Sequence, residues 1–137
     1  MRVVIDTNLW LSGLMLPGSV PGHIVRAALM AQITAILSEP MLQELRLALH
    51  YRRVRPRISL SDEEIERYLA ELRYIAETVD IAGSTARVPR DRRDDIVLAT
   101  YIASGADYLL TGDDDLLSLR PDHSILTARE FYEQHLR

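Results

Sequence analysis

The sequence predicts an α/β fold in which helices cover both faces of a mostly parallel central sheet of four to five strands, a three-layer α/β/α arrangement. Three observations support this. Apolar runs of strand length alternate with segments of helical periodicity along the whole chain. Several of the helical segments begin with capping signals. No linker or repeat divides the chain, so we expect a single domain over residues 1–137.

The first strand is predicted at residues 2–6, where "RVVID" is a short apolar run that ends in an acid. The segment "PGSVPG" then breaks the chain, and the apolar residues that follow recur at helical spacing. These residues are Ile24, Ala27, Ala28 and Ala31. The run "ITAIL" at 33–37 predicts the second strand.

Two further helices are predicted from their starts. Ser38 is suited to cap the next helix, and Pro40 lies in the first turn, where proline is tolerated. The apolar side of that helix consists of Met41, Leu45, Ala48 and Leu49. The clearest helix begins at Ser61, which forms a capping box with Glu64. Its apolar residues at helical spacing are Ile65, Tyr68, Leu69, Leu72, Ile75 and Ala76.

A third, weaker strand is predicted for "TVDIA" at 78–82. The segment "DDIVLATYIASG" at 94–105 predicts a helix that Gly105 ends, since glycine is a common helix stop. The fourth strand is "DYLLT" at 107–111, which leads directly into three consecutive aspartates.

A short fifth strand is predicted for "SILT" at 124–127. Thr127 and Glu130 form a second capping box that opens a last helix through "AREFYEQHL". Strands and helices therefore alternate to the end of the chain, which indicates βαβ units. In such sheets the functional site lies beyond the carboxyl ends of the strands.

Composition and charge exclude several chemistries. The chain contains no cysteine, which excludes disulfides, thiolate catalysis and cysteine-based zinc sites. All 16 basic residues are arginine, so lysine chemistry is excluded, and with it receiver domains and haloacid-dehalogenase-like phosphatases. A net charge of −4 does not favour a general nucleic-acid binder. With neither a signal peptide nor an apolar run of membrane length in view, we expect a cytoplasmic protein without membrane contact.

Four acids stand out by their positions. Asp6 follows the first strand and Asp113 follows the fourth, so both are expected at the same edge of the sheet. Glu44 lies on a helix and Asp94 opens one; taken singly, each has an ordinary structural reading as a solvated or helix-stabilising acid. Several converging carboxylates without lysine need cations, and oxygen-only ligands suit Mg²⁺ or Mn²⁺. Such an ion suits phosphodiester hydrolysis.

These motifs resemble the PIN-domain nucleases, and more narrowly the VapC-like toxin components of bacterial toxin–antitoxin pairs. The resemblance rests on "VVIDTN", on a helical glutamate after "SEP", and on "RDRRDDIVLATYIASGADYLLTGDDDLL". It covers nearly the whole chain, and its most specific part is 91–117. It implies a PIN-like fold, a Mg²⁺- or Mn²⁺-dependent endoribonuclease, a small antitoxin partner and a homodimer. Single-stranded RNA is the expected substrate, because a splayed backbone reaches a recessed pocket more easily than a duplex does.

The resemblance also implies roles for individual residues. Carried over by motif, the catalytic and metal-binding acids are Asp6, Glu44, Asp94 and Asp113. The supporting residues are Thr7, Asn8, Thr111 and Asp115. The chain departs from the family pattern in "DRRDD", where two arginines replace a proline and an acid. Counting back from "LATYIASG" selects Asp94, while Asp95 and Asp91 remain alternatives.

Arginines cluster in two segments and are candidates for contact with the RNA backbone. They are Arg52, Arg53, Arg55, Arg57, Arg92 and Arg93. A solvated face, or salt bridges to nearby acids, is the alternative reading of these residues.

Two further expectations concern partners and activity. The stretch "NLWLSGLML" (8–16) is too apolar for all of its large side chains to face one core, which predicts self-association. Those side chains are Trp10, Leu11, Leu14, Met15 and Leu16. The alternative to a nuclease is a catalytically weak PIN-like module that binds RNA or a protein.

Overall fold

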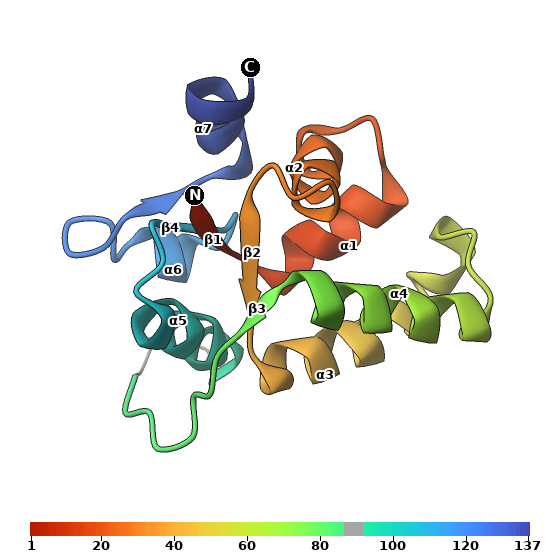
Figure 1. The fold of residues 1–137 in the computed structure, drawn as a ribbon, viewed down its shortest axis with the longest axis horizontal. Helices are drawn as coiled ribbons and strands as arrows, with labels where there is room; N and C mark the ends of the chain where they lie inside the picture. Colours follow the sequence, from red (N-terminus) through yellow and green to blue (C-terminus); the bar gives the residue numbers. More distant parts are fainter. Residues whose placement is uncertain (87–91) are drawn as a thin grey trace.

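The five strands form one sheet in the order β3-β2-β1-β4-β5, and every pairing between them is parallel (Figure 1). This computed structural model describes residues 1–86 and 92–137, with the side chain of Arg92 left out. The strands are β1 (Arg2–Ile5), β2 (Thr34–Leu37), β3 (Glu77–Thr78), β4 (Tyr108–Leu110) and β5 (Ile125–Leu126). The predicted α/β class with a parallel central sheet is confirmed.

The first strand lies at the centre of the sheet. Val3 pairs with Ala35 of β2 on one side and with Tyr108 of β4 on the other. The side chains of Val3, Val4 and Ile5 are fully buried. This is expected of a central parallel strand, which has helices against both faces and therefore reads as a continuous apolar run.

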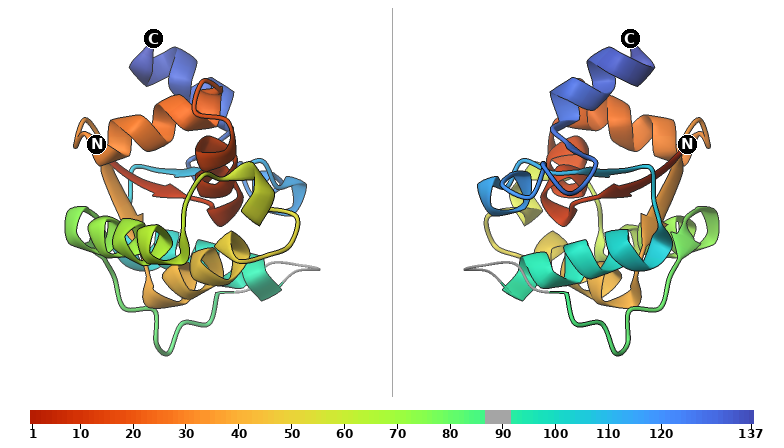
Figure 2. Two further views of the ribbon diagram at one scale, coloured as in Figure 1. Left: turned by 90° about the vertical axis from the view of Figure 1, so that its right-hand side faces the viewer. Right: turned by 90° about the vertical axis from the view of Figure 1, so that its left-hand side faces the viewer.

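Helices form a layer on each side of the sheet (Figure 2). One layer contains α1 (Thr7–Met15), α2 (Val20–Leu29) and α7 (Ala128–Phe131), which a π-helical turn extends over Tyr132–Leu136. The other contains α3 (Glu39–Leu49), α4 (Asp62–Ile75) and α5 (Arg92–Ser104). A short helix, α6 (Asp114–Leu117), follows β4, and a 3₁₀ turn covers Arg55–Arg57. None of the helices in the described part of the chain has the length and apolar character of a membrane span.

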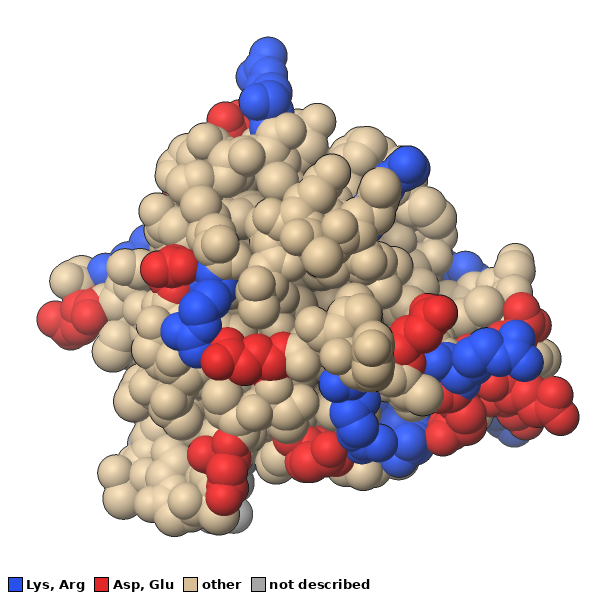
Figure 3. Space-filling view, viewed as in Figure 1, with Lys and Arg blue, Asp and Glu red and all other residues tan. Residues whose placement is uncertain are grey.

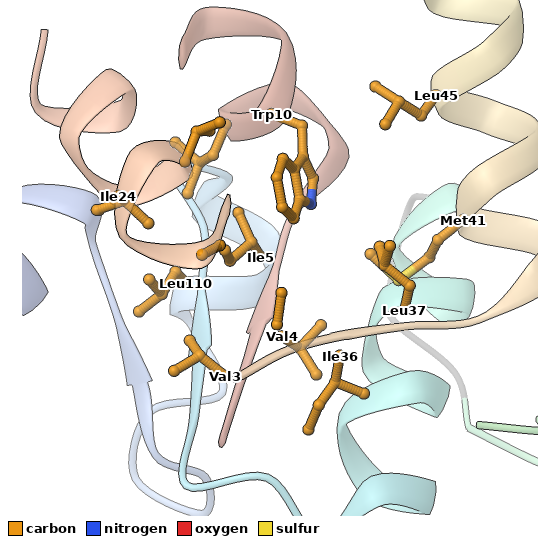
Figure 4. Close-up of a cluster of buried hydrophobic side chains, with 14 of the residues drawn as sticks. Val3, Val4, Ile5, Trp10, Ile24, Ile36, Leu37, Met41, Leu45 and Leu110 are labelled. Atoms are coloured by element: carbon orange, nitrogen blue, oxygen red, sulfur yellow. The ribbon is translucent and has the colours of Figure 1, made fainter. Parts of the chain in front are cut away.

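The stretch after β1 contributes to the core instead of forming an exposed apolar surface. Figure 4 shows the Trp10 indole lying between Ile5 and Leu45, and Trp10 is fully buried. Leu9 and Leu11 are also buried, and Leu14 and Met15 pack against the core. Only Leu16, at 65% exposure, stays outside. The five side chains therefore do not all face the core, as expected, but Leu16 alone among them stays exposed, because a helix follows β1 at once.

The capping signals are confirmed at two of three helix starts. Ser61 Oγ accepts from the Glu64 amide at 3.1 Å, and the reciprocal bond of the capping box is present; the same holds for Thr127 and Glu130. Ser38 occupies the N-cap of α3 but makes no capping bond. Its hydroxyl pairs instead with Thr100 on α5, at 2.8 Å.

The third strand differs most from its predicted bounds. The third strand covers Glu77–Thr78 and not 78–82, because its partner β2 ends at Leu37, opposite Thr78. One more backbone bond, from Val79 to Leu37, closes the pairing. Gly105 ends α5 as predicted, with a φ of +63° that suits glycine.

Candidate active site

The four predicted acids line one pocket of about 360 Å³ at the carboxyl-terminal edge of the sheet. The start of α1 supplies Asp6, α3 supplies Glu44, α5 supplies Asp94, and the segment after β4 supplies Asp113. The complete lining is Asp6, Thr7, Asn8, Leu11, Glu44, Leu47, Ala48, Tyr51, Arg93, Asp94, Val97 and Asp113. The topology brings them together because neighbouring parallel strands end at the same edge.

Thr111 connects the ends of the two central strands. Its hydroxyl donates to Asp6 Oδ2 at 2.7 Å and accepts from the Asp113 amide at 3.0 Å. The Asp6 amide donates to Leu110 O at 2.9 Å, which extends the pairing of β1 with β4. Asp6 occupies the N-cap of α1 without a capping bond from its side chain. Thr111, which is fully buried, therefore orients Asp6 and the acid segment together.

The surroundings of Asp6 disfavour its charge. The side chain is only 6% exposed, and this burial raises the pKa of Asp6 above its ordinary value of 3.8. The Thr111 hydrogen bond opposes the rise, whereas the negative charge of Asp113 adds to it. A cation in the pocket would favour the ionised carboxylate.

Three carboxylates form the tightest group of potential ligands. One oxygen each from Asp94, Asp113 and Asp115 lies within 4.8 Å of the others. Asp113 caps α6 by accepting from the Asp115 amide at 2.8 Å, so the short helix turns Asp115 back toward the site. Asp114, the middle acid, is exposed. Asp115, predicted only as a supporting residue, thus lies with the principal acids.

The structure places Asp94, and not Asp95, in the pocket. Asp94 is 5% exposed and lines the cavity, whereas Asp95 is partly buried and does not. The other alternative, Asp91, lies outside the described residues. Glu44 is partly buried and lines the pocket from α3, but it does not belong to the three-carboxylate group.

The remaining supporting residues occupy the start of α1. Thr7 is 8% exposed, and its hydroxyl finds no hydrogen-bond partner within the described parts of the chain. Asn8 is exposed and also lines the pocket. Both side chains therefore present polar groups to whatever the pocket holds.

The predicted arginines separate into two groups. Arg93 is exposed and lines the pocket. Arg55 is instead held within the protein, by Asp62 at 2.7 Å and by Leu60 O at 3.0 Å. The side chain of Arg92 lies outside what the structure describes.

Arg52, Arg53 and Arg57 are exposed and form no ion pair with the described residues. The arginines of α3 and α4 differ from these three, because basic and acidic side chains interleave along the two helices (Figure 3). Arg46 forms an ion pair with Glu66, and Arg73 forms one with Glu39.

An apolar wall of the pocket was not anticipated from the sequence. Leu47 and Tyr51 follow Glu44 by three and seven residues, so all three fall on one side of α3 and its end. Leu47 is 61% exposed and Tyr51 is 51% exposed. The helical spacing of Leu47 and Tyr51 from Glu44 could have indicated that they line the same pocket.

The donors of this site fit a hard divalent cation. They are carboxylate oxygens, converging from chain segments that are far apart in sequence, and three of them lie close enough to share one ion. Mg²⁺ and Mn²⁺ take oxygen ligands of this kind.

Comparison with known proteins gives three findings. A model of the PIN domain matches residues 2–115. The uncharacterized protein MJ1680 of Methanocaldococcus jannaschii is 26% identical over 144 aligned residues, which cover 98% of this chain and 91% of that protein. A chain in the crystal structure of VapBC2 from Rickettsia felis, bound to a DNA fragment from their promoter, superposes with a TM-score of 0.64 at 13% identity. That match covers 93% of this chain and 98% of the other, and at this identity it concerns the fold.

Proposed function

Because this chain belongs to the PIN domain family, we propose that it is a Mg²⁺- or Mn²⁺-dependent endoribonuclease that hydrolyses phosphodiester bonds in single-stranded RNA. The observation that carries the proposal is the group formed by Asp94, Asp113 and Asp115, whose oxygens lie within 4.8 Å of one another. Asp6 and Glu44 line the same pocket.

In this proposal Asp94 and Asp113 hold the cation, with Asp115 supporting them, and Asp6 and Glu44 complete the site directly or through water. When bound, the cation activates a water and neutralises charge that develops on the phosphate oxygens. Thr111 keeps Asp6 directed at the site through its 2.7 Å bond.

The remaining groups act on the substrate. Glu44, partly buried on the α3 wall, orients the attacking water. Arg93, at the same pocket, contacts a substrate phosphate, because a guanidinium donates to two phosphate oxygens at once. Single-stranded RNA is favoured because the acids lie in a recessed pocket, which an unpaired backbone can enter.

A cleavage assay tests the proposal. End-labelled single-stranded RNA, the matching duplex and single-stranded DNA are incubated with the protein in Mn²⁺, in Mg²⁺ and in EDTA. We expect cleavage of the single-stranded RNA with either ion and none in EDTA.

Two neighbouring variants provide the control. Asp113→Asn should remove activity, whereas Asp114→Asn should keep it, because Asp114 is exposed and outside the three-carboxylate group. Equal activity of wild type and Asp113→Asn would reject the assignment. Tight RNA binding by the wild type without cleavage of any RNA tested would favour a binding module instead.

We infer further that the protein is the toxin of a toxin–antitoxin pair and that it forms a homodimer. The role as a toxin with an antitoxin partner is supported by the fold shared with a chain of the VapBC2 structure. Exposed apolar side chains at the ends of α1 and α2, Leu16 and Met30, support contact with another protein surface. A small reading frame next to the gene, whose product copurifies and abolishes cleavage, would support the toxin role. Light scattering tests the dimer, and a monomer mass at micromolar concentration would reject it.

A further inference from the structure

The pocket of the site has two unlike sides. One is formed by the acids at the ends of β1 and β4 and at the start of α5. The other is formed by α3 and its end, where the large side chains of Leu47 and Tyr51 follow Glu44. Both apolar side chains are more than half exposed, although they adjoin a strongly charged cavity. Ligand pockets are commonly lined by apolar and aromatic side chains of this kind.

The backbone holds Tyr51 firmly, although its side chain is exposed. The Tyr51 amide donates to Ala48 O at 3.1 Å, and the Tyr51 carbonyl accepts from the amides of Val54 and Arg55, both at 3.0 Å. Val54 is buried in the core and anchors this turn. The backbone that carries the ring is therefore held in place beside the pocket.

The charges around this wall suit a nucleic acid. Arg93 lines the same pocket. Arg52 and Arg53 directly follow Tyr51 in the chain and are exposed. Proteins that bind single-stranded nucleic acid combine such cations, which contact the backbone, with an aromatic ring on which a base stacks. A purely apolar partner surface would offer no negative charge to Arg52 and Arg53.

We propose that Tyr51, supported by Leu47, is the platform on which one base of the RNA stacks beside the phosphodiester held at the acid site. The inference rests on the proposed ribonuclease function and adds a substrate-positioning residue to it. Stacking on a ring is possible for any base once it is unpaired, so the platform selects for single-stranded RNA and only weakly for sequence.

Binding is measured in the Asp113→Asn background, which is expected to leave RNA intact in Mn²⁺. The probe is a fluorescein-labelled hexanucleotide RNA, and a series of probes carries one abasic position at each site in turn. We expect Tyr51→Ala to weaken binding of the intact probe about tenfold, the order of one stacked base. Tyr51→Phe should bind within about twofold of the parent, because stacking needs the ring and not the hydroxyl.

Tyr74→Ala is the matched control. Tyr74 is 91% exposed on α4 and does not line the pocket, so its removal should leave binding unchanged. At one probe position the abasic change and Tyr51→Ala should together cost no more than either change alone, since both remove the same contact. In the wild-type background, Tyr51→Ala should raise KM about tenfold with a smaller effect on kcat.

Two outcomes would overturn the stacking role of Tyr51. One is that the losses of binding free energy from Tyr51→Ala and from the abasic change add up at every probe position. The other is unchanged RNA binding together with a shifted monomer–dimer equilibrium in sedimentation, which would assign the surface to a second copy of the chain. The ribonuclease proposal has a separate failure. If the wild type binds RNA with the expected coupling but cleaves none, the ribonuclease proposal is rejected and the stacking role of Tyr51 stands.

Discussion

Two opposing influences act on the Asp6 carboxylate. Burial and the charge of Asp113 disfavour its ionised form, whereas the Thr111 hydroxyl favours it, and the net effect is a raised pKa. The native state of the metal-free protein therefore keeps this proton to a higher pH than the unfolded chain does. The stability that Asp6 contributes is complete below its ordinary pKa of 3.8 and is lost as pH rises through the raised value.

Replacing Asp6 should remove this pH dependence. In EDTA, the melting temperature of the wild type should fall as pH rises from about 4 through the raised pKa, and Asp6→Asn should show a flatter curve. At neutral pH the variant should melt at the same or a higher temperature, because its amide oxygen still accepts from Thr111 and carries no charge. Parallel curves for the two proteins in thermal melts against pH would contradict this.

The two neighbouring aspartates after Gly112 should respond differently to cations. Asp113 belongs to the three-carboxylate group and Asp114 does not. Mn²⁺ at about one hundred times its dissociation constant should raise the wild-type melting temperature by roughly 5–10 °C, through mass action on the native state. The shift should vanish in Asp113→Asn and persist in Asp114→Asn. The opposite pattern would show that the assignment within the acid segment is displaced by one residue.

At the scale of elements, the contact between Ser38 and Thr100 joins the start of α3 to the middle of α5. Both hydroxyls are fully buried, and Thr100 also donates to Ile96 O at 2.8 Å. Because the Thr100 proton is used there, Ser38 is the donor in the bond between them. This contact fixes the helix of Glu44 against the helix of Asp94.

Removing the Ser38 hydroxyl and removing the Thr100 hydroxyl should therefore lower the free energy of unfolding by different amounts. Ser38→Ala leaves Thr100 bonded to Ile96 and should cost about 1 kcal/mol. Thr100→Val, which keeps the side-chain shape, leaves a buried donor on Ser38 without an acceptor and should cost about 1–3 kcal/mol. Urea unfolding of both variants measures the difference, and a larger loss for Ser38→Ala would contradict the assigned donor.

The approach of α2 to the preceding loop depends on one glycine. A Cβ at Gly22 would overlap the carbonyl of Pro17, whereas one at Gly18 would meet nothing within 4 Å. Alanine normally stabilises a helix by up to about 1 kcal/mol relative to glycine. Here the overlap should dominate, so that Gly22→Ala destabilises by about 1–3 kcal/mol. Gly18→Ala is the control and should be nearly neutral in the same urea titration.

The sequence predicted those elements whose signal is local. The strand at 33–37 differs from the observed β2 only at its first residue, and both capping boxes are present. Two helices were not anticipated. α1 begins at once after β1, with adjacent large apolar residues that hide its periodicity, and α6 has only four residues. The position of Asp115 beside Asp94 and Asp113 depends on α6, so it could not be anticipated for the same reason.

Positions in the candidate site could be predicted for acids that directly follow strands. They were harder to predict for residues whose place depends on how the helices pack. Asp6 and Asp113 could be placed from the strand ends alone. The choice of Asp94 over Asp95 depends on the rotation of α5, which the spacing of one helix does not determine. The apolar wall with Tyr51 needed the approach of α3 to the acids, which only the packed structure provides.

At the scale of the molecule, the acids of the pocket come from four separate segments of the chain, so a shared cation should stabilise the whole fold. We expect Mn²⁺ to raise the midpoint of guanidinium unfolding without changing the slope, since the surface exposed on unfolding stays the same. EDTA should reverse the effect. If Mn²⁺ changed the slope, or left the midpoint unchanged, the ion would not be bridging these segments of the native fold.

The central position of β1 also has a consequence for synthesis. β1 is synthesised before its neighbour β4, and Thr111, the hydrogen-bond partner of Asp6, follows Asp6 by 105 residues. Domains emerge from the ribosome at about 5–20 residues per second. A nascent chain that ends before β4 holds Asp6 but neither Asp113 nor the strand that positions it. The acids therefore stay apart during synthesis until β4 and the segment after it have been made.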